Sequence, residues 1–241
     1  MSKQPVTATQ ILICDADHLI LPPHAKHLLS QPEQARLNKM QSPQQAKLFL
    51  LGRYLLRQLL APALQQAPEH IAISLDEKGK PQLTEASWHF NISHSGNLLA
   101  LAFGNQGPLG IDVESRTLSE KQIHRLAKRY FAPNEQVWLE QAQTQARFLQ
   151  LWTIKEAVLK AHGGGIANNL SAVQWQPFEP IAHFDKAQYQ LHLYQAQHTR
   201  VTLALQDAAL LHNDNIHRLN VADLPFALEI SGPQPNLSYS V

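Results

Sequence analysis

Two acidic segments, one with the residue pattern of a strand and one with that of a helix, constrain this chain of 241 residues most strongly. Side chains alternate between the two faces of a strand, so in residues 110–114 the carboxylates of Asp112 and Glu114 share one face. Two carboxylates this close repel each other, and a bound cation would remove the repulsion. The segment is therefore either a cation site or a pair of solvated acids at the end of a strand.

The second segment has the pattern of a helix with one apolar side. Glu156 and Lys160 are four residues apart, on a line that also contains Trp152 and that diverges from the apolar side. The pair is either an ordinary surface ion pair or the projecting part of a site. Together the two segments offer carboxylates and lysines that suit a divalent cation bridging a phosphorylated ligand. The apolar side is predicted to consist of Leu151, Ile154, Val158 and Ala161.

Composition excludes several other kinds of site. A net charge of +1, from 20 basic and 19 acidic residues, gives no global attraction to nucleic acid or to a membrane surface. The single cysteine, Cys14, excludes an internal disulfide framework and a cysteine metal site. No apolar run approaches the roughly 20 residues that span a bilayer, and no signal sequence is recognisable. We therefore expect a soluble, cytoplasmic protein without nucleic-acid or membrane partners.

The order of predicted elements indicates an α+β fold made of two similar halves. In each half, helical segments precede about three strands, so we expect a small antiparallel sheet packed against a helix in residues 1–107 and again in residues 108–241. The tail beyond Leu211 has no predicted place. Helices are predicted at residues 33–60 with a break near Pro43, at 119–129, from Asn134, and at 146–161; strands are predicted at 10–14, 71–75, 88–92, 98–103, 109–113, 172–175, 189–194 and 201–205.

Other segments carry groups that could bind phosphate. Residues 91–95 (NISHS) end a strand with hydroxyls such as that of Ser93 and with the imidazole of His94, and strand-terminal loops offer donors to anions. Lys78 and Lys80 lie in the turn that follows the second predicted strand. Taken alone, His94 could equally be a turn histidine whose hydrogen bonds are internal, and Lys78 and Lys80 could be solvated side chains.

In their order and spacing, these segments together resemble the 4′-phosphopantetheinyl transferases, in particular the larger, monomeric, broad-specificity subclass built from two halves. The resemblance covers about residues 33–165. It implies a pseudo-twofold fold with the active site in the cleft between the halves. It also implies transfer of the phosphopantetheine arm of coenzyme A to a serine of an acyl or peptidyl carrier protein, with adenosine 3′,5′-bisphosphate as the other product. The matching segments are residues 79–81, 90–95, 110–114, 128–131 and 152–160.

The resemblance implies roles for the acidic segments first. Asp112, Glu114 and Glu156 would face Mg²⁺, with Mn²⁺ as an alternative, and Lys160 would contact the pyrophosphate. Because the carrier serine must lose a proton as it attacks, Glu156 is also the candidate proton acceptor. Glu135 matches an acidic position that the family places near the metal. The first half would hold the nucleotide, and the second half the metal, the catalytic helix and the carrier.

For coenzyme A, the resemblance implies that Ser93 and His94 reach the 3′-phosphate and that the Lys80 turn lines the nucleotide end. One position departs from the family pattern. A basic residue that often meets the 3′-phosphate is replaced here by Leu48. We expect Lys47 or Arg53, or else Lys39, to take that role.

The carrier protein needs a docking surface. Carrier proteins are typically acidic near the modified serine, and the basic segment that begins at Lys121 and ends at Phe131 is a candidate, unless it is an ordinary amphipathic helix. Two other functions stay open at this point: a coenzyme A or carrier-binding module without catalysis, and a magnesium phosphodiesterase. Modification of a carrier supports the transferase, whereas hydrolysis of coenzyme A without a carrier supports the phosphodiesterase.

Overall fold

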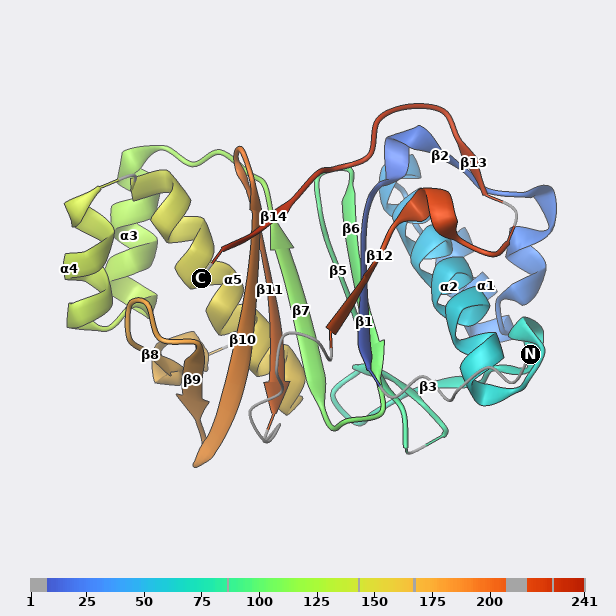
Figure 1. Ribbon diagram of the computed structural model, residues 1–241, viewed down its shortest axis with the longest axis horizontal. Helices are drawn as coiled ribbons and strands as arrows, with labels where there is room; N and C mark the ends of the chain where they lie inside the picture. Colours follow the sequence, from blue (N-terminus) through green and yellow to red (C-terminus); the bar gives the residue numbers. More distant parts are fainter. Residues whose placement is uncertain are drawn as a thin grey trace.

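The computed structural model describes residues 8–85, 87–142, 144–166, 168–206, 216–226 and 228–240. Figure 1 shows two layered halves side by side, with the sheets toward the middle of the molecule and the longest helices, α2 and α5, outside them. The predicted α+β class and the two similar halves are confirmed.

The N-terminal half is a four-stranded sheet, in the order β12-β1-β6-β5, covered on one face by α2. Ser42 accepts a hydrogen bond from the amide of Gln45 and so caps α2, whose first residue is Pro43, as the sequence predicts. The helices and strands of the N-terminal half, apart from those of the C-terminal tail, are β1 (Thr9–Asp15), β2 (Leu19–Ile20), α1 (Gln31–Asn38), α2 (Pro43–Leu64), β3 (Ile73–Leu75), β4 (Pro81–Leu83), β5 (His89–Ser95) and β6 (Leu98–Gly104).

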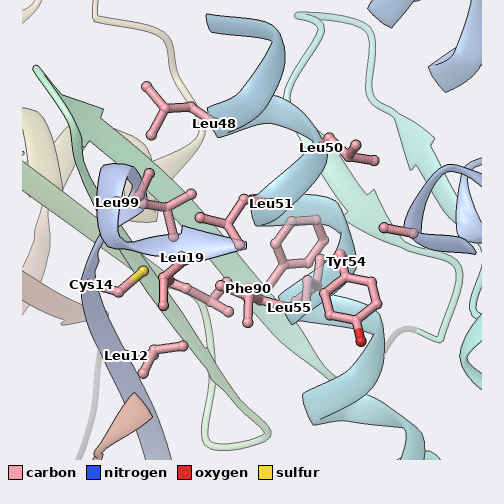
Figure 2. Close-up of a cluster of buried hydrophobic side chains, with 14 of the residues drawn as sticks. Leu12, Cys14, Leu19, Leu48, Leu50, Leu51, Tyr54, Leu55, Phe90 and Leu99 are labelled. Carbon is pink, nitrogen blue, oxygen red and sulfur yellow. The ribbon is translucent and has the colours of Figure 1, made fainter. Parts of the chain in front are cut away.

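The core of this half lies between α2 and the sheet. Figure 2 shows Leu51 and Leu55 of α2 packed among side chains of the strands, including Leu12, Phe90 and Leu99. Cys14 is fully buried in the same cluster, and burial raises the pKa of its thiol to about 12. It serves as a small apolar residue of the first strand.

The C-terminal half repeats this plan with a sheet in the order β7-β11-β10-β9-β8 and with α5 packed on β7 and β11. In both halves, a strand that precedes the long helix pairs antiparallel with the second strand of a hairpin that follows the helix. These pairs are β1 with β6 in the N-terminal half and β7 with β11 in the C-terminal half. Its elements are β7 (Leu109–Glu114), α3 (Glu120–Tyr130), α4 (Pro133–Gln141), α5 (Thr144–His162), β8 (Gln174–Trp175), β9 (Ile181–Phe184), β10 (Ala187–Ala196) and β11 (Thr199–Gln206).

The two sheets meet through a second apolar core. Ile11 and Ile13 of β1 and Ile111 and Val113 of β7 belong to the same buried cluster, together with residues of β6, β10 and β11. Because side chains alternate along β7, burying Ile111 and Val113 between the sheets turns the intervening acid toward α5. The junction between the halves therefore fixes which way the acidic residues of β7 point.

A ladder of side chains joins β5 to β7 across this junction. Amides of β7 and of the residue after it donate to polar side chains of β5, in place of the backbone bonds of a continuous sheet. The three donor and acceptor pairs are Ile111 with Asn91, Val113 with Ser93, and Ser115 with Ser95.

The C-terminal tail, for which the sequence predicted no place, connects the two halves. β12 (Ile216–Leu219) pairs parallel with β1, β13 (Glu229–Ile230) pairs with β2, and β14 (Ser238–Ser240) returns to pair with β10 (Figure 1). β12 and β13 therefore pair with strands of the N-terminal half, whereas β14 pairs with a strand of the C-terminal half. Among the described helices, none has both the length and the apolar character needed to cross a membrane.

Candidate active site

The position of α5 against β7 depends on a residue without a side chain. A Cβ placed on Gly110 would lie 2.2 Å from the carbonyl oxygen of Ala157 and 2.4 Å from the amide nitrogen of Ala161. Asp112 and Glu114 follow Gly110 at intervals of two, so all three face α5, as the alternation predicts. The close approach of strand and helix therefore brings the acids of β7 to the side chains of α5.

α5 is packed on most of its surface, and its four predicted apolar residues are buried. Trp152, Glu156 and Lys160 are each partly exposed and form one line along the helix. Its remaining charged residue in this stretch, Lys155, is fully buried. Solvent and ligands can therefore reach this part of α5 along the line that contains Glu156 and Lys160.

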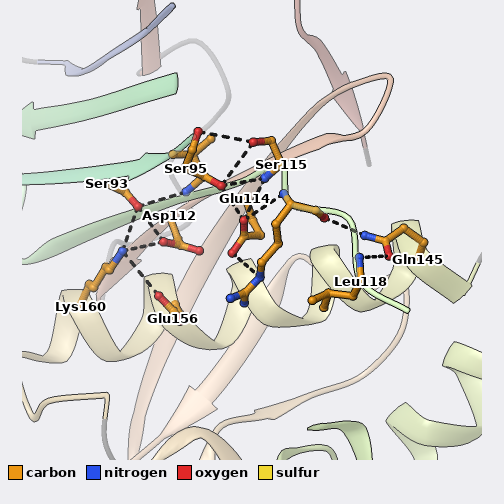
Figure 3. Close-up of polar contacts among 11 residues, drawn as sticks. Ser93, Ser95, Asp112, Glu114, Ser115, Leu118, Gln145, Glu156 and Lys160 are labelled. Carbon is orange, nitrogen blue, oxygen red and sulfur yellow. Dashed lines mark hydrogen bonds and ion pairs between the residues drawn. The ribbon is translucent and has the colours of Figure 1, made fainter. Parts of the chain in front are cut away.

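Lys160 is the centre of the polar contacts at the junction of β5, β7 and α5 (Figure 3). Its Nζ lies 2.5 Å from Oδ1 of Asp112, 3.0 Å from Oγ of Ser93 and 3.7 Å from Oε2 of Glu156. The Ser93 hydroxyl donates to the same Asp112 oxygen at 2.7 Å. A serine of the first half thus helps to hold an acid and a lysine of the second half.

The carboxylates of this cluster carry more negative charge than Lys160 balances. Burial and the charge of Asp112 raise the pKa of Glu156 to about 7, although Lys160 and Arg116 act in the opposite direction. Burial also raises the pKa of Asp112, again against the effect of Lys160. A proton or a further cation between Asp112 and Glu156 would therefore be stabilised.

The donor chemistry at this position fits a divalent cation in part. Carboxylate oxygens are the ligands that Mg²⁺ and Mn²⁺ prefer, and Asp112 and Glu156 present them close together with an unbalanced charge. Among the described residues, however, no three acidic, histidine or cysteine side chains are arranged to hold a metal ion as they stand. Two of the three predicted ligands fit such an ion, and the third has other partners.

That third carboxylate, of Glu114, is bonded along its own strand end. Its Oε1 accepts hydrogen bonds from the hydroxyl of Ser95 at 2.5 Å and from the amide of Ser115 at 3.0 Å. Its Oε2 lies 2.9 Å from Nε of Arg116, whose guanidinium also lies 5.0 Å from the centre of the Trp152 ring. No sequence pattern indicated Arg116, and Ser95 was expected only as one of the hydroxyls of residues 91–95 that could bind phosphate.

The predicted nucleotide end adjoins the C-terminal turn of α5. Nζ of Lys80 donates to the carbonyl oxygen of Lys160, and burial lowers the pKa of Lys80 while Asp76 opposes that shift. A pocket of about 270 Å³ lies here, lined by both halves of the protein. Its lining includes Lys80, Pro81, His89, Leu109, His162 and Gly163.

His94 lies in β5 between Ser93 and Ser95, and the residue is exposed to solvent. Loss of hydration and, next, the charge of Lys160 lower the pKa of its imidazole. The influence of Lys160 indicates that the two side chains lie within electrostatic range of each other. Lys47 of α2 is partly exposed, whereas its neighbour Leu48 is buried.

Arg53, a candidate for the 3′-phosphate, and Glu135, a candidate for a position near the metal, both form internal ion pairs. Nε of Arg53 lies 2.8 Å from Oε1 of Glu33, and burial lowers the pKa of Arg53 to about 10. Glu135 is fully buried, lies 2.9 Å from Nζ of Lys155 and accepts a hydrogen bond from the amide of Ala132 at the start of α4. In place of the expected position near a metal, the structure gives Glu135 a capping and ion-pairing role.

Comparison with known protein families places both halves of the chain. The model of the 4′-phosphopantetheinyl transferase superfamily matches residues 108–217. A second model, of the N-terminal part of 4′-phosphopantetheinyl transferases, matches residues 23–106. Together the two models cover the elements that contribute Lys80, Ser93, Asp112, Glu156 and Lys160.

Individual relatives carry the same description. A putative 4′-phosphopantetheinyl transferase of Synechocystis is 39% identical over 171 residues, which is 68% of this chain and 68% of that protein. The 4′-phosphopantetheinyl transferase HetI of Nostoc is 39% identical over 147 residues, 58% of this chain and 61% of that protein. The 4′-phosphopantetheinyl transferase Sfp of Bacillus subtilis is 33% identical over 155 residues, 58% of this chain and 67% of that protein.

Proposed function

The chain belongs to the 4′-phosphopantetheinyl transferase superfamily, and from this premise we propose that it transfers the 4′-phosphopantetheine group of coenzyme A to a serine of an acyl or peptidyl carrier protein. The observation that carries the proposal is the meeting of Asp112, Glu156 and Lys160 at the junction of β7 and α5. We expect the enzyme to act as a monomer, because residues of both halves of one chain contribute to this junction. We also propose that it is cytoplasmic, as expected from its sequence.

In this proposal, Asp112 and Glu156 hold a divalent cation, Mg²⁺ or Mn²⁺, and Glu114 joins them as a third ligand. When bound, the ion would neutralise the oxygens of the coenzyme A diphosphate and the charge of the leaving bisphosphate. The raised pKa of Glu156 supports this assignment, because burial and, next, the charge of Asp112 disfavour the ionised carboxylate, which a bound cation would favour.

Glu156 is the proposed proton acceptor. The serine oxygen of the carrier forms a bond to the β-phosphorus of coenzyme A, and the bond from that phosphorus to the bridging oxygen breaks. The electron pair of the broken bond leaves with adenosine 3′,5′-bisphosphate, and the serine proton passes to the carboxylate of Glu156 directly or through a water.

Lys160 and the basic groups around it would bind the coenzyme. The Lys160 ammonium is partly exposed and could turn from Asp112 to the diphosphate, where it would stabilise charge that develops on the leaving group. The pocket beside Lys80 is the proposed nucleotide site. His94 with Ser93, and Lys47 in preference to the internally paired Arg53, are the candidates for the 3′-phosphate.

α3 is the proposed docking surface for the carrier. Its apolar residues Ile123 and Ala127 pack inward, whereas Arg125 and Lys128 are exposed. These cations would attract acidic residues near the serine of a carrier protein. Arg116, which pairs with Glu114, lies on the segment that connects β7 to α3. The proposed docking surface is therefore next to the candidate active site along the chain.

Mass spectrometry of carrier proteins tests the proposal. The protein is incubated with coenzyme A, Mg²⁺ and a panel of apo carriers from fatty-acid, polyketide and peptide-synthetase systems, each with a serine-to-alanine control. We expect one phosphopantetheine to be added to at least one serine-containing carrier and a chelator to abolish the addition. If no carrier gains mass, the proposal is wrong. Release of bisphosphate from coenzyme A alone would then indicate a phosphodiesterase, and binding without turnover would indicate a binding module.

A further inference from the structure

Two basic side chains of the chain itself pair with the acidic residues of the candidate site. Lys160 lies against Asp112 and within 3.7 Å of Glu156, and Arg116 lies against Glu114. The positive charge of Arg116 also acts to lower the pKa of Glu156, so its guanidinium affects a second carboxylate of the candidate site. Each predicted metal-facing carboxylate thus has an internal counter-ion close by.

The contact between Arg116 and Glu114 is one that a bound cation would have to replace. Nε of Arg116 lies 2.9 Å from Oε2 of Glu114, while the backbone amides of Ser115 and Arg116 donate to Oε1. Oε2 is therefore the oxygen that the guanidinium covers. A divalent ion and a guanidinium cannot both occupy the same side of this oxygen, because the two positive charges repel each other at contact distance.

The backbone of Arg116 is held by hydrogen bonds, whereas its side chain is partly open to solvent. The side-chain amide of Gln145 donates to the carbonyl oxygen of Arg116 and accepts from the amide of Leu118, which holds the segment after β7 against α5. The Arg116 side chain itself is 42% exposed, compared with 11% for Glu114. Its guanidinium also lies over the face of Trp152, a contact that can retain it after it leaves the carboxylate.

We propose that Arg116 is a positioning residue that masks Glu114 in the metal-free enzyme, so that a divalent cation and the Arg116 guanidinium compete for Oε2 of this carboxylate. The inference rests on the proposed role of Glu114 as a cation ligand. It adds a residue that no family motif in the sequence indicated. It predicts that the protein without coenzyme A binds divalent ions more weakly than its carboxylates alone would allow.

The test is Mn²⁺ binding to the full chain without coenzyme A, followed by the electron paramagnetic resonance signal of free Mn²⁺. Arg116→Gln should lower the dissociation constant about three- to tenfold, because it removes both the competing partner and a nearby positive charge. Arg116→Lys keeps a competing cation and should stay close to the wild-type value. An unchanged or higher dissociation constant for Arg116→Gln would overturn the inference, as would the absence of any measurable binding in both proteins.

Arg200 offers a matched control for charge. It stands opposite Glu114 in the β7–β11 pairing, but its guanidinium donates to the carbonyl oxygens of Gln197 and Thr199. Arg200→Gln should therefore tighten Mn²⁺ binding much less than Arg116→Gln does. Equal tightening would show that net charge alone causes the effect, and it would overturn the inference.

Failure of this inference can be distinguished from failure of the proposed function. If wild-type protein modifies a carrier but Arg116→Gln does not tighten Mn²⁺ binding, this inference alone fails. If wild-type protein modifies no carrier, the proposed function fails, whatever the Mn²⁺ affinities are.

Discussion

No side chain separates Gly110 of β7 from Ala157 of α5, and a Cβ on the glycine would lie 2.2 Å from the alanine carbonyl oxygen. This contact sets the spacing between Asp112, two residues along the strand, and Lys160, one turn along the helix. The two charged groups meet at 2.5 Å because the backbones that carry them are in contact. The glycine is thus a structural requirement of the site as well as of the fold.

Gly110→Ala should therefore destabilise the protein strongly. The new methyl group meets backbone atoms, which cannot rotate away, so β7 and α5 must separate. We expect a loss of about 2–4 kcal/mol in the free energy of unfolding, measured by denaturant titration, together with loss of transfer.

Gly52→Ala is the matched control in the other half. A Cβ there would lie 3.3 Å from the end of the Leu99 side chain and 3.4 Å from that of Ile92, which can adjust. Alanine also favours the helix, so this variant should stay within about 1 kcal/mol of the wild type. Similar losses for both substitutions would contradict the importance assigned to Gly110.

Protonation of Glu156 should make stability depend on pH in a defined direction. Its pKa is about 7 in the folded protein and 4.5 in a model peptide, so the folded protein holds this proton to a higher pH than the unfolded chain does. This carboxyl group therefore lowers the free energy of unfolding as the pH rises through that interval. Glu156→Gln lacks the effect, and its stability relative to the wild type should rise by about 2 kcal/mol between pH 5 and pH 8 in the presence of a chelator.

Thermal or denaturant unfolding at several pH values measures this difference. Glu77→Gln makes the same chemical change in an exposed turn, and its stability relative to the wild type should stay constant over the same range. A flat difference for Glu156→Gln would show that the Glu156 carboxyl group is not held protonated by burial and by Asp112.

His94→Ala should weaken the binding of coenzyme A more than that of dephospho-coenzyme A. The exposed imidazole lies within electrostatic range of Lys160, where a phosphate would favour its charged form. We expect about a tenfold increase in the dissociation constant for coenzyme A, and at most about a twofold increase for the dephospho form, by isothermal titration calorimetry. His124→Ala, on the exposed face of α3, should change neither value. Equal losses for both ligands would exclude a contact of His94 with the 3′-phosphate.

Charge reversal on α3 tests the docking surface. The double substitution Arg125→Glu and Lys128→Glu should raise the KM for an acidic carrier about tenfold or more, while the affinity for coenzyme A stays the same. Lys26→Glu with Lys186→Glu changes the net charge equally on exposed positions elsewhere. If the two double variants have the same KM for the carrier, α3 is not the docking surface.

Local signals predicted most of the elements. Pro43 and Ser42 start α2, the glycines after Lys160 follow the end of α5, and the alternation in β7 gives the correct faces for its acids. The expected cap at Asn134 was two residues late, because Pro133 takes the first helical position of α4 and Ala132 precedes it. The predicted strand at residues 172–175 is shorter, since a 3₁₀ turn, Leu170–Ala172, occupies its start.

Contacts between distant segments could not be predicted in the same way. β12 pairs with β1 although about 200 residues separate them, and no local pattern encodes such a partner. Ser93 was expected at a phosphate, but its hydroxyl also joins Val113 of the other half to Asp112 and Lys160. Sequence patterns indicated residues of the candidate site, and only the fold shows which of them contact each other.

The most direct test of the account is the rate of carrier modification by Glu156→Gln, with Mg²⁺ and coenzyme A at saturation, followed by intact-protein mass spectrometry. Because α5 is anchored by buried apolar residues, the variant should fold like the wild type, which circular dichroism and thermal unfolding can verify. The account predicts a loss of about a hundredfold or more in the rate of a folded protein. A folded variant that modifies the carrier at nearly the wild-type rate would contradict it.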